Sequence, residues 1–245
     1  MFNFLKNHPF AIEAYFKNSL VLTFAVPKDD LQPLIPACLE LDSFKDKYAF
    51  IAVAMVETSQ LRPKGFPEFM GNDFFLIGYR IFVRYTNEAG KRLRGLFILK
   101  SETDKRKMEL LGDIFTHYNY TTTDIKKTVK DGKTEIISVK SKFNILIDNN
   151  DGEILLPPGS PFSDWKEARK FAGPLPFTFS FNKNNNKVLI IEGVRENWNP
   201  EPVNIIHCSF DFLNKLNLKE AVLANAFMIR DIPYYWKKGK TEQWK

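Results

Sequence analysis

The stretch GDIFTHYNY, residues 112–120, concentrates side chains that could do chemistry. It places His117, one of only three histidines among 245 residues, beside the phenols of Tyr118 and Tyr120. A histidine can act as a general acid or base because its pKa lies near neutral pH, and a phenol both donates and accepts hydrogen bonds. Two interpretations stay open. His117 is a catalytic residue with Tyr118 and Tyr120 binding a ligand, or it is a core residue with satisfied hydrogen bonds.

Two arginines, Arg80 and Arg84, occur in the long apolar run FFLIGYRIFVRYT, residues 74–86. Strand alternation puts both side chains on the same face. If that face is buried, each guanidinium needs an anion, which is a carboxylate either of the protein or of a ligand. Arg80 would then bind a small organic anion. In the alternative, both arginines face water and the odd-numbered apolar residues of the run form the core face.

A third candidate is the segment GVRENWNPEP, residues 193–202, which puts Arg195 and Glu196 beside Trp198 just past a predicted strand. Loop residues of this kind often line the mouth of a site. An ordinary salt-bridged turn explains them equally well.

Several catalytic signatures are missing from the sequence. There is no GxSxG elbow, no GxxxxGK[ST] loop, and no CxxC or HxxxH pair. His8, His117 and His207 are isolated, and none has a carboxylate at metal-ligand spacing. We therefore predict no metal and no cofactor. Cys38 and Cys208 are expected to be buried free thiols, although a disulfide between them stays open.

Charge and hydropathy limit the partners. The chain has 35 Lys and Arg against 29 Asp and Glu, and residues 236–245 hold four of the lysines and one glutamate. A charge spread so thinly over the rest makes no phosphate-tracking stripe, so we predict no nucleic-acid partner and a solvated basic tail at 236–245. No apolar run reaches the ~18 residues that span a membrane, and the start lacks a signal peptide. A cytoplasmic protein without membrane contact is expected.

The elements that must position these residues are mainly strands. The 23 phenylalanines and the hydrophobic content of 44% favour half-buried pleated surfaces. Hairpins are predicted for 74–103, around DGK at 131–133 and around NKNNNK at 182–187. Short helices are predicted within 27–36, from 103 to about 111, and at 164–171. This pattern predicts one α+β domain over residues 1–245, built round a large antiparallel sheet or barrel.

Four segments together resemble a known family. They are, in chain order, VPKDDLQPLIPACLELD, LRPKGFPEFMGNDFFLIGYRIFVRY, LRGLFILKSETD and LLGDIFTHYNY. They resemble the acetoacetate decarboxylase-like superfamily, in particular its YqjF-like bacterial branch. The likeness covers about residues 19–235. It implies a closed or nearly closed, β-barrel-like antiparallel sheet that encloses a central cavity, with a few short outer helices.

The resemblance also implies a chemistry, which the residues do not carry over. The decarboxylases use a lysine whose lowered pKa lets it form a Schiff base with a β-keto acid. In the matching stretch Asn119 or Tyr120 stands at the place of that lysine, and no lysine occurs between Lys107 and Lys126. Neither an amide nor a phenol forms an iminium. Arg80 stands near the place of a family carboxylate, which reverses the charge.

The first functional hypothesis is therefore a cavity that binds a small anionic or carbonyl-bearing molecule. Arg80 would hold it, with His117, Tyr118 and Tyr120 in the wall. The protein would be a lyase-like or isomerase-like enzyme without a covalent amine intermediate, or purely a ligand-binding protein.

Two alternatives remain. In one, aromatics fill the cavity of a structural or interaction protein, and the ring-rich end IPYYWKKG, residues 232–239, forms a homo-oligomer interface. In the other, a different lysine such as Lys100 replaces the missing nucleophile.

Overall fold

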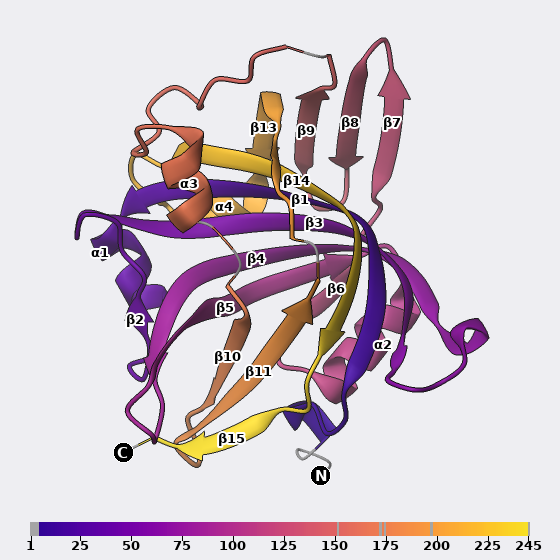
Figure 1. Ribbon diagram of the computed structural model, residues 1–245, viewed down its shortest axis with the longest axis vertical. Coiled ribbons are helices and arrows are strands. Elements are labelled where there is room, and N and C mark those ends of the chain that lie inside the picture. The colour runs from indigo at the N-terminus through magenta and orange to yellow at the C-terminus, as the bar shows by residue number, and fades with distance from the viewer. Residues whose placement is uncertain (1–4, 151, 172, 174, 197, 245) are drawn as a thin grey trace.

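Long strands wrap into a ring-like sheet in the computed structural model of this chain (Figure 1). The structure describes residues 5–150, 152–171, 173, 175–196 and 198–244. The ring consists of β14 (Val222–Trp236), β1 (Ile12–Pro27), β3 (Tyr48–Pro63), β4 (Asn72–Thr86), β5 (Arg92–Thr103), β10 (Phe177–Asn182) and β11 (Lys187–Arg195), in that spatial order. It closes because β11 pairs back onto β14.

The remaining elements surround this ring. Short strands at its margins are β2 (Glu40–Leu41), β6 (Tyr120–Thr122), β12 (Glu201–Pro202) and β15 (Lys240–Gln243). A second sheet contains β13 (Asn204–Phe210), β9 (Phe143–Asp148), β8 (Lys133–Ser138) and β7 (Lys126–Lys130). The helices are α1 (Lys28–Leu31), α2 (Arg106–Phe115), α3 (Trp165–Phe171) and α4 (Asp211–Lys215), with 3-10 turns η1 (Leu5–Asn7), η2 (Gln32–Leu34) and η3 (Glu68–Met70).

The predicted α+β class with a large sheet and few short helices is confirmed. The three predicted hairpins are present as the antiparallel pairs β4–β5, β7–β8 and β10–β11. The sheet is not purely antiparallel, however, since β5 pairs in parallel with both β10 and β6. These parallel contacts join segments far apart in the chain, which local sequence patterns do not encode.

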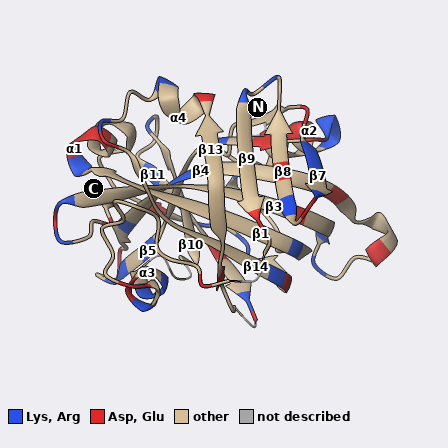
Figure 2. Cartoon of the chain, turned by 90° about the horizontal axis from the view of Figure 1, so that it is seen from above, with Lys and Arg blue, Asp and Glu red and all other residues tan. Residues whose placement is uncertain are grey.

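Both faces of the long strands are buried, and alternation assigns each residue to one of them. On β4, Ile77 and Tyr79 face outward into a cluster with the second sheet, whereas Phe74 and Leu76 face into the ring. Figure 2 shows β13, β9, β8 and β7 lying across the strands of the ring. The second sheet thus covers the outer face of these strands, whereas their inner face packs in a different hydrophobic cluster inside the ring.

Basic and acidic residues are interspersed along the elements drawn in Figure 2. All residues of the edge strand β7 are exposed, and three of them are lysines. Lysines on an exposed edge discourage pairing with another sheet. Among the helices of the described residues, none has the length and apolarity needed to cross a membrane.

Two sequence predictions need correction. Helix α2 does not end near Leu111 but continues to Phe115, whose ring packs edge-on against Phe10 at a centroid distance of 5.4 Å. The expected solvated tail at 236–245 contains strand β15, which pairs with β11. Trp244 packs against Phe181 at 5.5 Å. In both cases contacts with distant residues order a segment that local composition makes polar.

The buried carboxylate of Glu242 holds β15 in place. It is 2% exposed, and it accepts hydrogen bonds from Lys240 Nζ at 2.7 Å, Tyr85 Oη at 3.3 Å and the Glu88 amide at 3.0 Å. Buried acceptors of this kind are expensive to remove because their donors are left unpaired.

We expect Glu242→Ala to lower the free energy of unfolding by about 2 kcal/mol, since it leaves the Tyr85 hydroxyl and the Glu88 amide without an acceptor. Urea denaturation measures the change. The control is Glu40→Ala, which removes an exposed ion pair with Arg92 and should cost less than about 0.5 kcal/mol. Equal losses in both variants would contradict a structural role for Glu242.

Candidate functional site

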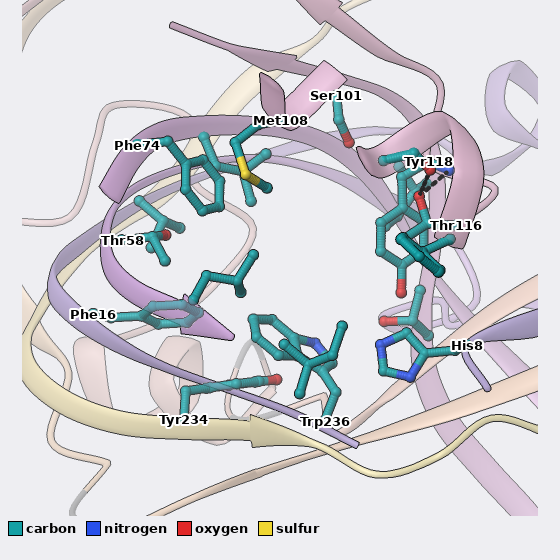
Figure 3. A pocket seen from close by; sticks show the side chains of 18 of the residues that line it. His8, Phe16, Thr58, Phe74, Ser101, Met108, Thr116, Tyr118, Tyr234 and Trp236 are labelled. Carbon is teal, nitrogen blue, oxygen red and sulfur yellow. Dashed lines mark hydrogen bonds between the residues drawn. The ribbon is translucent and has the colours of Figure 1, made fainter. Parts of the chain in front are cut away.

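A cavity of about 310 Å³ lies inside the ring (Figure 3). Strands β1, β3, β4, β5 and β14, helix α2 and the segment 116–120 all contribute to its wall. The lining is mainly apolar, as is usual for small-molecule sites. Within the described part of the chain, it contains three arginines and one histidine but no lysine, aspartate or glutamate. Arg62 forms an ion pair with Glu13, with Nη2 and Oε1 3.0 Å apart, so Arg80 and Arg195 are the arginines of the described lining without an ion pair.

Arg80 occupies the inner face of β4, and the second long-strand arginine does not share its surroundings. The Arg84 guanidinium forms an ion pair with Asp42, with Nε and Oδ1 2.5 Å apart. Among the described residues Arg80 has no carboxylate partner, and its buried Nε has no hydrogen-bond acceptor. Burial lowers the pKa of Arg80, an effect that the neighbouring Tyr234 and Tyr120 oppose. An arginine nevertheless stays protonated in proteins.

Gly78 makes room for this guanidinium. A Cβ atom at Gly78 would lie 2.7 Å from Nε of Arg80 and 3.0 Å from its Nη2. Two residues apart on one strand, Gly78 and Arg80 share the inner face. The Arg80 head group therefore folds back over the glycine.

Arg195 and Trp198 form a second part of the wall. Arg195 Cζ lies 4.1 Å from the ring centroid of Trp198 and 5.7 Å from that of Tyr234, both within cation–π range. Buried Nη2 of Arg195 and Nε1 of Trp198 both lack an acceptor in the structure described. Glu196 is exposed and makes no ion pair with Arg195 among the described residues. The alternative of a turn held by an Arg195–Glu196 salt bridge is therefore not observed. Instead, Arg195 and Trp198 line the cavity.

The tyrosines predicted at 118 and 120 also lie in this wall. Thr116 ends helix α2 by donating from its hydroxyl to the Gly112 carbonyl at 2.8 Å, and the Tyr118 amide donates to Thr116 Oγ1 at 3.3 Å. Tyr120 packs on Gly112, where a Cβ would lie 2.2 Å from the tyrosine ring. Burial raises the pKa of Tyr120 to about 12 and raises that of Tyr118 as well. Both phenols are therefore neutral donors at pH 7.

His117 faces a different part of the molecule. Thr116, Tyr118 and Tyr120 line the cavity, whereas the intervening His117 lines a smaller hollow with Asn7 and residues of β10 and β11. Burial lowers the pKa of His117, and Lys6 adds to this effect. The catalytic role stays a prediction, but His117 does not share a cavity with Arg80.

His8 is the histidine that lines the cavity. It is 3% exposed, its backbone is left-handed with φ 53°, and its buried Nδ1 has no partner among the described residues. Burial lowers its pKa to about 4, which a backbone hydrogen bond to Lys237 partly opposes. His8 is thus a neutral imidazole at pH 7. The residues around His8 in the sequence do not predict its place in the cavity wall. That place depends on where η1 and β14 lie in the folded chain.

The lysine considered as a replacement nucleophile does not reach the cavity. Lys100 Nζ lies 2.7 Å from Oε1 of the buried Glu102 and 5.4 Å from the ring centroid of Phe212, outside the ring. In the described ranges no three His, Cys, Asp or Glu side chains gather into a metal site. Cys38 and Cys208 are free, the first buried and the second half-buried, and burial raises the pKa of each thiol to about 11.

Unpaired buried polar atoms concentrate at this cavity. Nine buried side-chain nitrogen and oxygen atoms of the described residues have no hydrogen-bond partner, and six of the nine belong to residues that line it. These six are His8 Nδ1, Thr58 Oγ1, Arg80 Nε, Tyr118 Oη, Arg195 Nη2 and Trp198 Nε1. Native proteins leave few such atoms unexplained. Among the described residues, the buried polar atoms without a partner thus gather at one cavity.

Comparisons with known proteins agree with the fold. Residues 13–233 match the family DUF2071, described as "Uncharacterized conserved protein (COG2071)". The chain is similar to the acetoacetate decarboxylase of Legionella pneumophila (TM-score 0.62, 12% identity, 96% of this chain and 88% of that chain). It is also similar to an acetoacetate decarboxylase-like enzyme from Sphingomonas wittichii RW1 (TM-score 0.58, 13% identity, 98% and 94%). No curated protein matches the sequence.

A third similar structure is the enduracididine biosynthesis enzyme MppR complexed with pyruvate (TM-score 0.54, 9% identity, 95% of this chain and 90% of that chain). At these identities the structures establish the fold alone. The predicted resemblance to the acetoacetate decarboxylase-like superfamily is therefore confirmed at the level of the fold.

The buried neutral His8 predicts a pH dependence of stability. Its folded pKa of about 4 lies below the value near 6.5 of an unfolded histidine, so the unfolded chain binds the extra proton between these values. Stability is therefore lost as pH falls from about 6.5 to 4, by about 3 kcal/mol for this residue. His8→Asn, whose side chain tolerates left-handed backbone, should remove that loss.

Urea unfolding at pH 7 and pH 4.5 measures the effect in each variant. The control is His207→Asn, the same substitution at a histidine that is exposed on β13 and does not line the cavity, and it should not reproduce the effect of His8→Asn. A His8→Asn protein with the pH dependence of the parent would show that His8 is not the residue responsible.

Proposed function

The chain belongs to the DUF2071 family, and we propose that its central cavity binds a small organic anion through Arg80. What carries the proposal is one observation: a guanidinium on the inner face of the ring, in a cavity whose described lining holds no carboxylate. A buried cation without a partner is costly. A ligand carboxylate would supply the missing acceptor and bind the guanidinium bidentately.

Neighbouring donors support an anionic ligand. Tyr234, Tyr120 and Tyr118 act electrostatically on Arg80. Burial lowers the pKa of Arg195, and the nearby charge of Arg80 adds to this effect. Tyr118 Oη and Arg195 Nη2 have no acceptor among the described residues. Related folds accept such molecules, since MppR is complexed with pyruvate in one structure and has HEPES buffer bound in another. Pyruvate is a carboxylate and HEPES carries a sulfonate.

We further propose that the site works without a covalent amine intermediate. No lysine lines the described cavity, and Lys100 is paired with Glu102 outside the ring. An acid–base step would therefore use the neutral imidazole of His8 or the phenols of Tyr118, Tyr120 and Tyr234. These groups support either binding alone or a lyase-like or isomerase-like proton transfer, but not the decarboxylation that proceeds through an iminium.

The alternative, an interaction protein with a filled cavity, has less support. A volume of about 310 Å³ is at the lower end of the range for small-molecule sites. In the ring-rich segment 232–239, Tyr234 and Trp236 line the cavity, and Lys64 Nζ lies over the Tyr235 ring at 4.2 Å. These aromatics are engaged within the chain. A homo-oligomer stays a prediction, and its interface would have to involve residues other than these aromatics.

Isothermal titration with 4-methyl-2-oxopentanoate, a carboxylate with an apolar body, tests the proposal. Arg80→Met should weaken binding at least tenfold, because it removes a charge-assisted bidentate contact. The control is Arg92→Met, whose exposed ion pair with Glu40 lies outside the cavity. Equal affinity of the parent and Arg80→Met proteins would refute the proposed role of Arg80. Borohydride treatment with this ligand should label no lysine covalently.

Arg80→Met, which should weaken ligand binding, should increase the stability of the ligand-free protein. Without ligand, Arg80→Met removes a buried cation that lacks an acceptor, so the free energy of unfolding should rise by about 1–3 kcal/mol. Urea denaturation of ligand-free protein measures this. Arg84→Met, which leaves the buried Asp42 with only Arg94, should instead destabilise the fold. A loss of stability in Arg80→Met would mean that Arg80 already has a partner within the chain.

A further inference from the structure

Two rows of side chains divide the cavity wall. Cross-strand pairing puts Phe16, Thr58 and Phe74 side by side on β1, β3 and β4. Arg80 lies in a second row with Ala52 of β3. At a rise of about 3.3 Å per residue, the Cα atoms of Phe74 and Arg80 are about 20 Å apart along β4. The long side chain of Arg80 and its fold over Gly78 shorten the gap between the two ends but do not merge them.

The end distant from Arg80 is mainly apolar, with the uncharged hydroxyl of Thr58 between Phe16 and Phe74. Phe16, Phe74 and Met108 are each less than 10% exposed, and they belong to one hydrophobic cluster. Figure 3 shows these three side chains together on one side of the open space, with Tyr118 and Thr116 on the opposite side. Aromatic rings and a thioether pack well against an aromatic ligand. They offer nothing to a second charged group.

The cavity volume indicates the size of the ligand that would fill it. Liquid water occupies about 30 Å³ per molecule, so a space of about 310 Å³ accommodates a ligand of about ten non-hydrogen atoms. A pyruvate-sized anion bound at Arg80 would leave the apolar end empty. A ligand that contacts both ends buries more apolar surface, which is the main favourable term in such binding.

Arg195, the second arginine without an ion pair, does not require a second negative charge on the ligand. Arg195 and Tyr234 line the cavity and also an outer hollow on the other side, which contains Glu13 and Glu196. Arg195 thus borders a hollow that contains two carboxylates, whereas neither the cavity nor the adjoining smaller hollow that Arg80 lines contains an aspartate or glutamate among its described residues.

We infer that the ligand is an arylalkyl monocarboxylate, with its carboxylate at Arg80 and its ring between Phe16, Phe74 and Met108. The inference rests on the proposed function and adds the chemical class of the ligand body. It makes Met108 on α2 and the cross-strand pair Phe16 and Phe74 the residues that determine specificity.

Titration calorimetry with three probes tests this class: 3-phenylpropionate, propionate and 3-phenylpropionamide. We expect 3-phenylpropionate to bind at least tenfold more tightly than propionate, because its ring occupies the apolar end. We also expect it to bind at least tenfold more tightly than the neutral amide, because only the acid pairs with Arg80.

The outcomes separate the two proposals. If propionate binds as tightly as 3-phenylpropionate, the inferred aromatic part of the ligand is wrong, but the proposed binding of an anion at Arg80 is retained. If the amide binds as tightly as the acid, the proposed function itself is wrong. If none of the three binds at millimolar concentration, both are refuted.

A pair of variants on one helix locates the ring. Met108→Gln places an amide at the apolar end and should weaken 3-phenylpropionate at least fivefold while leaving propionate unchanged. The matched control is Leu110→Gln on the same helix, since Leu110 is 61% exposed and does not line the cavity. An unchanged affinity in Met108→Gln would refute the inferred position of the ring.

Discussion

Closure of the ring is the constraint on which the rest of this structure depends. Three residue pairs between β11 and β14 join the ends of a sheet that would otherwise be open. An open sheet would leave the inner face of β4 in contact with bulk water, where an arginine needs no explanation. Once closed, the same face bounds a cavity of about 310 Å³. The closing pairs also include Arg195 and Tyr234, so the contact that completes the ring supplies part of the site.

Arg80 and Arg84 show how one strand can give two arginines opposite energetic roles. Both lie on the same face, four residues apart, as alternation requires. Arg84 shares the buried carboxylate of Asp42 with Arg94, and this arrangement contributes to the fold. Arg80 has no such acid among the described residues and folds over Gly78. A protein that keeps an unpaired guanidinium inside gives up stability, and ligand binding is a physical reason to do so.

The histidines show the limits of reading a site from local sequence. His117 stands among aromatic residues in GDIFTHYNY, yet the side chains that reach the cavity from this stretch are Thr116, Tyr118 and Tyr120. The alternation after α2 turns His117 to the other side. His8 lies in the cavity wall because the chain before β1 crosses the ring near β14, where the Gly239 amide donates to the His8 carbonyl at 2.9 Å. The residues next to His8 in the sequence do not predict this contact.

The sequence by itself determined the class of the fold, the three hairpins, and Arg80, His117, Tyr118 and Tyr120 as the residues to examine. These follow from local rules: apolar alternation sets strands, turn residues set hairpins, and a charge in an apolar run is conspicuous. The order of segments also indicated a resemblance to acetoacetate decarboxylase-like proteins, whose fold this chain shares. The tertiary structure alone decided which arginine has a carboxylate partner, which histidine reaches the cavity, and that β15 is a strand. Each of these depends on contacts between residues far apart in the chain, which no local pattern specifies.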